Sequence, residues 1–423
     1  MVAPKRGRRN ERVEGPAGSG RRLLWRLAAV LLLRAAPAAA SRRYGCAAFR
    51  RLAALDASGQ LRRAACVEFR ANGSVITVDA FSALNRTDAP QYAHYEDQAR
   101  HLLGDVVKEL SKQRSAAPSA EPGVRQRGAK ARRAPGMPVR LGSAVIMPYG
   151  DDASLSLEWN AALCQARAPL LSHASRKSML TDAILIPDWI FIADRGFSHT
   201  IRHLRKMPPF ERRRADVFWR GSTTGPVGFG SFGVDSSKLG CDGPDPESAL
   251  RVRLASVDVT RVKLARKAKG HPWLDVELVQ MVQLCQGDEA RLRAEGLVAS
   301  KVADTDWALH RGILEVDGNA NAWGNRWRAE SGSVVFKVEA EDAYVNAYSR
   351  LQVPNVHYVP LKPDLSDLAA KTRWITDAAQ AAELGRMAQR SADLAATFTY
   401  ASEVRRVADE LLRAWDGRCR ATA

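Results

Sequence analysis

Apolar and polar positions alternate along this chain in a way that predicts strands separated by helices. Short apolar runs predict strands at 144–147, 189–193, 217–219, 312–316, 333–338 and 356–359. Helical spacing of the apolar residues predicts helices at 275–284, 287–295, 326–330, 344–351, 364–374, 378–394 and 403–415. This order predicts parallel sheets with helices on their faces and a helical C-terminus.

Two stretches near the start of the chain differ from this rhythm. Residues 41–112 have mostly helical spacing, whereas 113–138 consist mainly of Ala, Pro, Gly, Ser and Arg and have almost nothing to bury. We therefore expect a disordered insertion or an exposed loop at 113–138. The predicted division is a leader (1–40), an N-terminal domain (41–205), a C-terminal domain (206–400) and a final helix (401–423).

The leader has the organisation of a targeting segment. A basic start precedes the apolar run Leu27–Leu33, and small residues at Ala38–Ala40 match a signal-peptidase site. Arg26 and Arg34 bracket the run, whereas a membrane-spanning helix needs about 20 apolar residues. We favour a cleaved signal peptide; an uncleaved membrane anchor and an Arg-rich transit peptide stay open.

Two further features favour the secretory pathway. Asn72-Gly-Ser and Asn85-Arg-Thr fit the N-glycosylation pattern. The six cysteines are an even number and have no CxxC spacing, so some can pair in an oxidising compartment, with buried free thiols as the alternative for each. The predicted location is the lumen of the endoplasmic reticulum or Golgi, or the outside of the cell.

Composition and charge narrow the class of partner only a little. The chain has 423 residues, 46% hydrophobic and 26% charged, as is typical of a globular protein. Of the formal charge of +18, the leader carries nine basic and two acidic residues, which leaves +11 on the remainder. A diffuse positive surface favours nucleotide phosphates, acidic glycans or membrane headgroups.

Two polar loops that follow predicted strands are candidates for binding an anion. In Arg220-Gly-Ser-Thr-Thr-Gly225, backbone amides and hydroxyls can approach phosphate oxygens, and the guanidinium can bind them in a bidentate way. The loop from Asp317 to Arg326 leaves a strand and enters a short helix, where Arg326 can neutralise a departing diphosphate. Each loop is equally compatible with an ordinary polar turn.

Three segments together resemble one family, the glycosyltransferases named after a fungal capsule-associated protein, which include animal protein O-glucosyltransferases. They are DVFWRGSTTG (216–225), ILEVDGNANAWGNRWRAESGSVVFKVEAEDAYVNAY (313–348) and LQVPNVHYVPLKPDLSDLAAKTRWITD (351–377). The resemblance runs from about residue 186 to the C-terminus.

The resemblance implies a metal-independent GT-B enzyme, in which two Rossmann-like domains face each other across a cleft. It implies an inverting transfer of glucose or xylose from a UDP-sugar to a hydroxyl acceptor such as Ser or Thr, with no cofactor. The residues that it places at the nucleotide sugar are Arg220, Gly221, Ser222, Thr223, Gly324, Asn325, Arg326 and Ser333.

The catalytic base is the least certain part of this prediction, because the family's second acidic position falls on Phe197 here. We assign the base to Asp194, at the expected carboxyl end of the strand 189–193, where ligands of α/β sheets collect. Asp188 is the alternative. Because it precedes that expected strand, we interpret it as a turn or cap residue.

Other functions stay open on the sequence alone. The acceptor can be a protein, a polysaccharide or a glycolipid, and the protein can bind a sugar nucleotide without turning it over. A basic secreted binder of polyanions is a third reading. We expect no nucleic-acid partner, and membrane contact only through an uncleaved leader.

Overall fold

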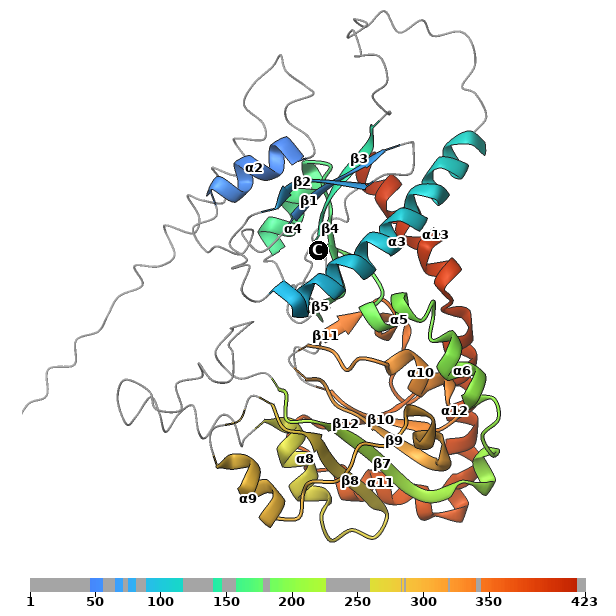
Figure 1. Ribbon diagram of the computed structural model, residues 1–423. Coiled ribbons are helices and arrows are strands. Elements are labelled where there is room, and N and C mark those ends of the chain that lie inside the picture. The colour runs from blue at the N-terminus through green and yellow to red at the C-terminus, as the bar shows by residue number, and fades with distance from the viewer. Residues whose placement is uncertain are drawn as a thin grey trace, which may run out of the picture.

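The computed structural model describes residues 46–55, 65–70, 75–80, 89–116, 140–146, 157–177, 183–225, 259–282, 284, 287–318, 320–339 and 344–416. The leader, both predicted glycosylation sites and residues 117–138 of the expected insertion lie outside the described residues. Within them the chain forms a mixed α/β structure with two five-stranded sheets, one above the other in Figure 1.

The first sheet combines an antiparallel and a parallel half. Its strands run in the order β2 (Val75–Ala80), β1 (Ala65–Arg70), β3 (Arg140–Ile146), β4 (Leu170–Ser172) and β6 (Ile184–Leu185). β1 is antiparallel to β2 and β3, whereas β3, β4 and β6 are parallel. The prediction that 41–112 is mostly helical misses β1 and β2, which separate α2 (Cys46–Leu55) from α3 (Ala89–Ala116). Helix α4 (Leu157–Gln165) precedes β4.

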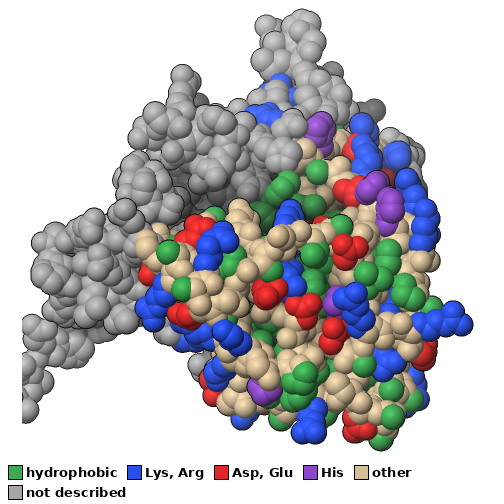
Figure 2. Space-filling view, turned by 60° about the horizontal axis from the view of Figure 1, so that its bottom comes forward, with side chains coloured by type: hydrophobic (Ala, Val, Ile, Leu, Met, Phe, Trp, Pro, Cys, Tyr) green, Lys and Arg blue, Asp and Glu red, His purple; other side chains and the backbone are tan. Residues whose placement is uncertain are grey.

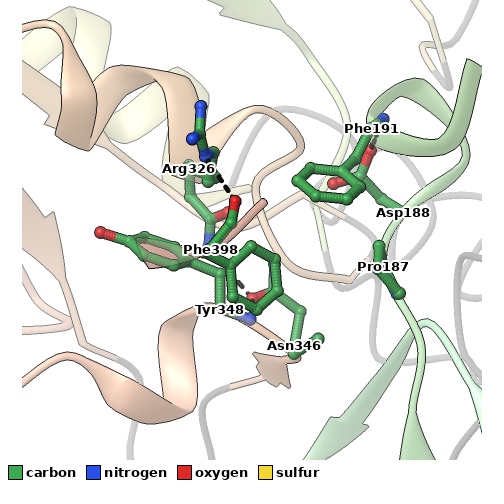
Figure 3. A pocket seen from close by; sticks show the side chains of 9 residues that line it. Pro187, Asp188, Phe191, Arg326, Asn346, Tyr348 and Phe398 are labelled. Carbon is green, nitrogen blue, oxygen red and sulfur yellow. Dashed lines mark hydrogen bonds between the residues drawn. The ribbon is translucent and has the colours of Figure 1, made fainter. Parts of the chain in front are cut away.

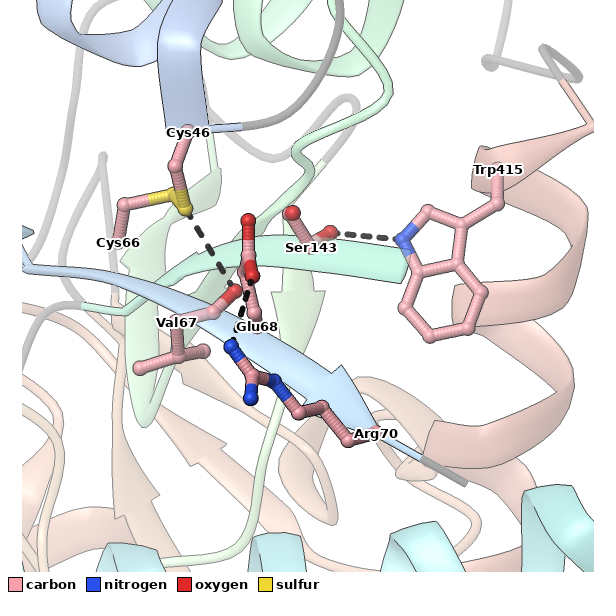
Figure 4. Close-up of a disulfide and its surroundings, with 7 residues drawn as sticks. All are labelled: Cys46, Cys66, Val67, Glu68, Arg70, Ser143 and Trp415. Carbon is pink, nitrogen blue, oxygen red and sulfur yellow. Dashed lines mark hydrogen bonds and ion pairs between the residues drawn. A yellow bond between two sulfur atoms is a disulfide. The ribbon is translucent and has the colours of Figure 1, made fainter. Parts of the chain in front are cut away.

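A disulfide ties α2 to the first sheet. Cys46 and Cys66 are joined, both are almost fully buried, and Figure 4 shows the bond beside β1. Cys164 also forms a disulfide. Because disulfides persist in oxidising compartments, these bonds favour a secretory location.

The second sheet is parallel throughout, in the order β12 (Val359–Leu361), β10 (Val334–Val338), β9 (His310–Glu315), β7 (Arg214–Ser222) and β8 (Leu274–Gln280). The strands predicted at 217–219, 312–316 and 333–338 are confirmed, and the one at 356–359 is shifted towards its C-terminus. The helix predicted at 275–284 is wrong, because β8 occupies this position. Val276 and Leu278 are buried with less buried residues between them, the period of two that marks a strand.

Helices flank the second sheet. They are α8 (Thr260–Ala268), α9 (Asp288–Ala294), α10 (Asn325–Glu330), α11 (Leu368–Thr372) and α12 (Ala378–Thr397). The helices predicted at 287–295, 326–330 and 378–394 are confirmed within a few residues. The one at 364–374 starts at Leu368 instead, after Asp367, while Asp364 accepts a hydrogen bond from the Ser366 amide in a turn.

Three connections join the two sheets. Residues predicted as a strand form helix α5 (Trp189–Ala193), followed by α6 (Ser198–Leu204). The helix predicted at 344–351 is instead β11 (Tyr344–Asn346), which pairs with β5 (Ala174–Arg176), and a short 3₁₀ turn. Finally, α13 (Tyr400–Trp415) runs back from the second sheet to the first, beside α3 (Figure 1).

Helix α13 is anchored on β3. The Trp415 indole donates a hydrogen bond of 2.6 Å to the Ser143 carbonyl (Figure 4). Gly142 makes room for the ring, because a Cβ there would lie 2.2 Å from it. None of the helices in the described part of the chain is long and apolar enough to cross a membrane.

Candidate functional site

The two sheets meet at the carboxyl ends of parallel strands. Asp188 follows β6 of the first sheet, and Asn325 and Arg326 follow β9 of the second. Together they line a pocket with Pro187, Phe191, Asn346, Ala347, Tyr348 and Phe398. Figure 3 shows Asp188 and Phe191 on one ribbon and Arg326, Asn346, Tyr348 and Phe398 on another. Ligands of open α/β sheets bind at this edge.

Asp188 is a buried carboxyl with a perturbed pKa. It is 8% exposed and caps α5 by accepting a hydrogen bond of 2.9 Å from the Phe191 amide. Burial raises the pKa of Asp188 to about 6, and hydrogen bonds from the Phe191 and Ile190 amides, with the attraction to Arg328, offset only part of this effect. A carboxyl that titrates close to neutral pH is suited to general base catalysis.

The pocket is narrow. Its volume is about 10 Å³, about the space that one water molecule needs. A hexose does not fit between Asp188 and the opposite wall as they stand. Nearby, Trp189 of α5 packs edge-to-face against Trp323, which precedes α10, with 5.4 Å between the ring centroids.

The side chain of Arg326 is already engaged within the protein. Its Nη1 lies 2.5 Å from Glu330, and its Nε donates to the Phe398 carbonyl at 3.1 Å (Figure 3). Burial lowers its pKa. Arg326 thus lines the predicted site, but its guanidinium joins α10 to the end of α12 rather than pointing freely into the pocket.

Asp194 does not line this pocket. The residues before it form helix α5 instead of the expected strand, so it does not sit at a strand end. It is half-buried, and its carboxylate accepts hydrogen bonds of 3.2 Å from the Ser198 hydroxyl and the His199 amide. These bonds hold the start of α6.

In the 220–225 loop, some residues serve the fold, whereas two hydroxyls lie beside an arginine of α8. Arg220 turns back along the sheet, where it pairs with Asp275 at 2.6 Å and Glu277 at 2.9 Å. Gly221 accommodates the Trp219 ring, 2.2 Å from where a Cβ would stand. The buried hydroxyl of Thr223 accepts from the Val282 amide at 2.8 Å. The side chains of Arg220 and Thr223 are thus engaged within the protein, and Gly221 makes room for a ring.

Ser222 and Thr224 instead present their hydroxyls to Arg261 of α8, which the sequence analysis missed. Arg261 Nη1 lies 3.0 Å from the Ser222 hydroxyl and 2.7 Å from that of Thr224. Its Nη2 and Nε bind the carbonyls of Val316 and Asp317 after β9. This arginine therefore joins the carboxyl ends of β7 and β9, with cationic charge beside two hydroxyls.

The remaining predicted residues differ in their placement. Gly324 has a φ of +80° directly before α10, and Asn325 donates to the Asn346 amide oxygen at 3.3 Å. Ser333 is fully buried at the amino end of β10, where it donates to the His310 carbonyl. This is the edge opposite the pocket, so the structure argues against a direct contact between Ser333 and a ligand.

Buried charges also lie under the second sheet's carboxyl edge. Lys337 is 3.4 Å from Glu315, and burial raises the pKa of the neighbouring Asp317 to about 6. Among the described residues, no group of three or more His, Cys, Asp or Glu side chains is arranged to hold a metal ion.

Comparison with known proteins finds a family match in the C-terminal part of the chain. Residues 254–402 match the model of glycosyl transferase family 90. This part of the chain is therefore similar to that family. Over 115 residues the chain is also 30% identical to protein O-glucosyltransferase 2 of Danio rerio. This match covers 24% of the chain and 23% of the relative, so the chain spans about a quarter of the relative's length.

The family 90 match covers much of the second sheet and the segments around it. It includes Arg261, the loop from Asp317 to Arg326 and the start of α13. Asp188 and the 220–225 loop precede the matched residues. Arg261 gave little sequence signal, because a lone arginine in an amphipathic helix has the pattern of a solvated surface residue. The apolar run after Asp188 is typical of a strand, and this pattern conceals that Asp188 stands before a helix and beside the pocket.

Proposed function

We propose that this chain is an inverting glycosyltransferase that moves glucose, or xylose, from a UDP-sugar to a hydroxyl group, with Asp188 as the catalytic base. The observation that carries the proposal is the position of this buried carboxyl. It follows β6, faces the carboxyl edge of the second sheet across the pocket, and has a pKa raised to about 6.

The chemistry requires one proton transfer and one displacement. The acceptor oxygen attacks the anomeric carbon while Asp188 takes the proton of its hydroxyl, and the bond between that carbon and the diphosphate oxygen breaks. UDP leaves with the electrons of the broken bond. The sugar is now bound to the acceptor with inverted configuration, because attack and departure occur on opposite faces of the anomeric carbon. A base with a pKa of about 6 is ionised at neutral pH and still accepts a proton in the transition state.

The leaving diphosphate needs positive charge and hydrogen-bond donors. Arg261, with the Ser222 and Thr224 hydroxyls, supports this role, since the two hydroxyls lie at the carboxyl end of β7 and Arg261 also binds the carbonyls that follow β9. Arg326 supports it indirectly, by holding α10 against the end of α12. Electrostatic stabilisation of this kind is commonly the largest contribution to catalysis. The narrow pocket implies that the two sheets move apart to admit the donor.

For the acceptor we propose a Ser or Thr of a protein, because the matching relative is named a protein O-glucosyltransferase. A lumenal or extracellular location suits the disulfides and the expected signal peptide. In keeping with the resemblance, we propose a GT-B arrangement for the two sheets and their helices, and a reaction that requires no metal or cofactor.

A second candidate is a protein that binds a sugar nucleotide without turnover. The engagement of Arg326 with Glu330 and Phe398 favours it, because this arginine is the cation that the sequence assigned to the leaving group. A polyanion binder is less well supported. On the face shown in Figure 2, Lys and Arg side chains are mixed with Asp and Glu rather than gathered in one patch.

Release of UDP from a panel of UDP-sugars tests the proposal. The disulfide-intact chain is assayed with UDP-glucose, UDP-xylose and other UDP-sugars, each with and without folded protein and glycan acceptors. We expect acceptor-dependent release from UDP-glucose or UDP-xylose. UDP binding without release from any donor would favour the non-catalytic candidate, and salt-sensitive polyanion binding without affinity for UDP would reject both.

A further inference from the structure

His173 is a buried histidine next to the pocket that none of the steps above uses. It directly follows β4, so it lies at the carboxyl edge of the first sheet, and it is 3% exposed. Its Nδ1 is 2.6 Å from the Pro187 carbonyl oxygen. Pro187 directly precedes Asp188, and both line the pocket.

The bond from His173 lies directly after the last backbone pairing of β4 with β6. The Ile186 amide donates to the Ser172 carbonyl at 2.8 Å, which continues the pairing of β6 with β4. The next residue, Pro187, has no N–H, so its backbone offers only the carbonyl as a hydrogen-bonding group. The imidazole binds the Pro187 carbonyl from the end of β4, at the point where the chain leaves the sheet.

This contact defines the state of the imidazole. A carbonyl oxygen only accepts, so Nδ1 carries the hydrogen and donates. Burial lowers the pKa of His173 to about 4, so the ring is neutral at physiological pH and Nε2 has a lone pair. A neutral ring adds no positive charge beside Asp188, and a positive charge there would lower the pKa of the carboxyl.

The same residue begins the link to the second sheet. Ala174, the next residue, pairs with Asn346 in the two-stranded sheet of β5 and β11. Asn346 lines the pocket and accepts hydrogen bonds from the backbone amides of Tyr348 and Ser349. His173 thus lies where the chain that carries the carboxyl and the opposite wall of the pocket come together.

We propose that His173 is a positioning residue for the transfer reaction. As the neutral Nδ1–H tautomer, it holds the Pro187–Asp188 peptide at the end of β6 and so keeps the Asp188 carboxyl over the pocket. This inference rests on the proposed role of Asp188 as the base. A displacement of about 1 Å at a catalytic group can cost about a hundredfold in rate, so the hold affects turnover more than donor binding.

Three substitutions at this position separate the hold from other roles. The amide nitrogen of Asn can take the place of Nδ1, whereas that of Gln falls closer to Nε2. We expect His173→Ala and His173→Gln to lower kcat about 10- to 100-fold with donor KM changed less than about threefold. His173→Asn should recover most of the lost kcat. Equal kcat for the Ala, Asn and Gln variants, or recovery by Gln and not by Asn, would overturn the proposal.

A matched control accounts for the loss of a buried histidine in general. His310 is also 3% exposed and is bound through Nδ1 to Asp216, at the amino end of β9 and away from the pocket. His310→Ala should lower the thermal unfolding temperature without the kcat loss of His173→Ala. An equal loss of kcat in both variants at matched stability would mean that His173 acts through general stability only, and would reject the proposal.

A measurement on the unsubstituted protein keeps the inference testable if the variants fold poorly. Histidine ¹⁵N spectra at pH 7 should show that His173 is neutral and protonated on Nδ1. A ring protonated on Nε2 would contradict the proposed tautomer. The Asp188→Asn variant distinguishes the two proposals. If it retains turnover, the assignment of the base fails, whereas full loss in Asp188→Asn without any effect of the His173 series rejects the positioning role alone.

Discussion

At the scale of single residues, the proposed chemistry rests on the position of one carboxyl. Asp188 lines the pocket between the sheets, whereas the Asp194 carboxylate binds Ser198 and His199 at the start of α6. Asp188 is also a cap, for α5, so the residue has two roles that a substitution must separate. Asn serves as an N-cap about as well as Asp does, but it cannot accept the proton.

The buried Asp188 should cost stability at neutral pH. Its pKa rises from 3.8 to about 6 on folding, so the folded state retains a proton that the unfolded state releases between these values. Stability from this group is therefore lost as pH rises towards 6. We expect Asp188→Asn to raise the free energy of unfolding at pH 7.5 by up to about 3 kcal/mol, with little gain near pH 4.

Urea unfolding of both proteins at the two pH values measures this difference. A gain that is equal at pH 4 and pH 7.5, or a loss at pH 7.5, would contradict the raised pKa. Such a result would also weaken the assignment of Asp188 as a base adapted to neutral pH.

The sequence could predict residue types in the site better than their roles. Arg220 and Arg326 were assigned to a diphosphate because arginines in polar loops match that chemistry, but both pair with acidic residues of their own fold. The partners of Arg220 are distant in the sequence. The partner of Arg326 is four residues away, which becomes a contact only when the segment is helical. His173 and Arg261 have roles that depend on strand ends brought together by the fold, so local pattern could not reveal them.

At the scale of elements, parallel strands of the second sheet were predictable and the connecting segments were not. β9 and β10 each contain a short apolar run (Ile313 and Leu314, and 334–336) and are largely buried, as expected for strands that are covered on both faces. The apolar run at 189–193 has the same appearance, but Asp188 at its start caps it as a helix. β11 forms only because β5 provides a partner from the other half of the chain.

Helix α13 buries apolar residues such as Val407 and Leu411 along its length and ends on Trp415. Trp415 is 8% exposed, packs edge-on against Phe69 and binds Ser143. We expect Trp415→Ala to lower the free energy of unfolding by about 3–5 kcal/mol, because it leaves a cavity on the first sheet. Trp374, 39% exposed, is the matched control, and its replacement by Ala should change stability by less than about 1 kcal/mol.

Chemical denaturation followed by circular dichroism compares the two tryptophan variants. Equal effects of both substitutions would show that α13 is not anchored on the first sheet as described. Because α13 leaves the second sheet and ends on the first, its loss should also lower the cooperativity of unfolding.

At the scale of the molecule, two sheets face each other through the carboxyl ends of their parallel strands. Helix α5, the β5–β11 pair and α13 join them, and the pocket lies where the first two connections meet. The sequence predicted strands and helices consistent with this plan. It did not predict how the two halves meet, because that depends on contacts between residues far apart in the chain.

The account is tested most directly by single-turnover transfer from UDP-glucose or UDP-xylose by two variants, Asp188→Asn and Asp194→Asn, with UDP binding measured in parallel. We predict that Asp188→Asn lowers the rate at least about 1,000-fold while UDP binds as in the wild type, and that Asp194→Asn stays within about threefold of the wild-type rate. Loss of transfer in Asp194→Asn with activity retained in Asp188→Asn would contradict the account.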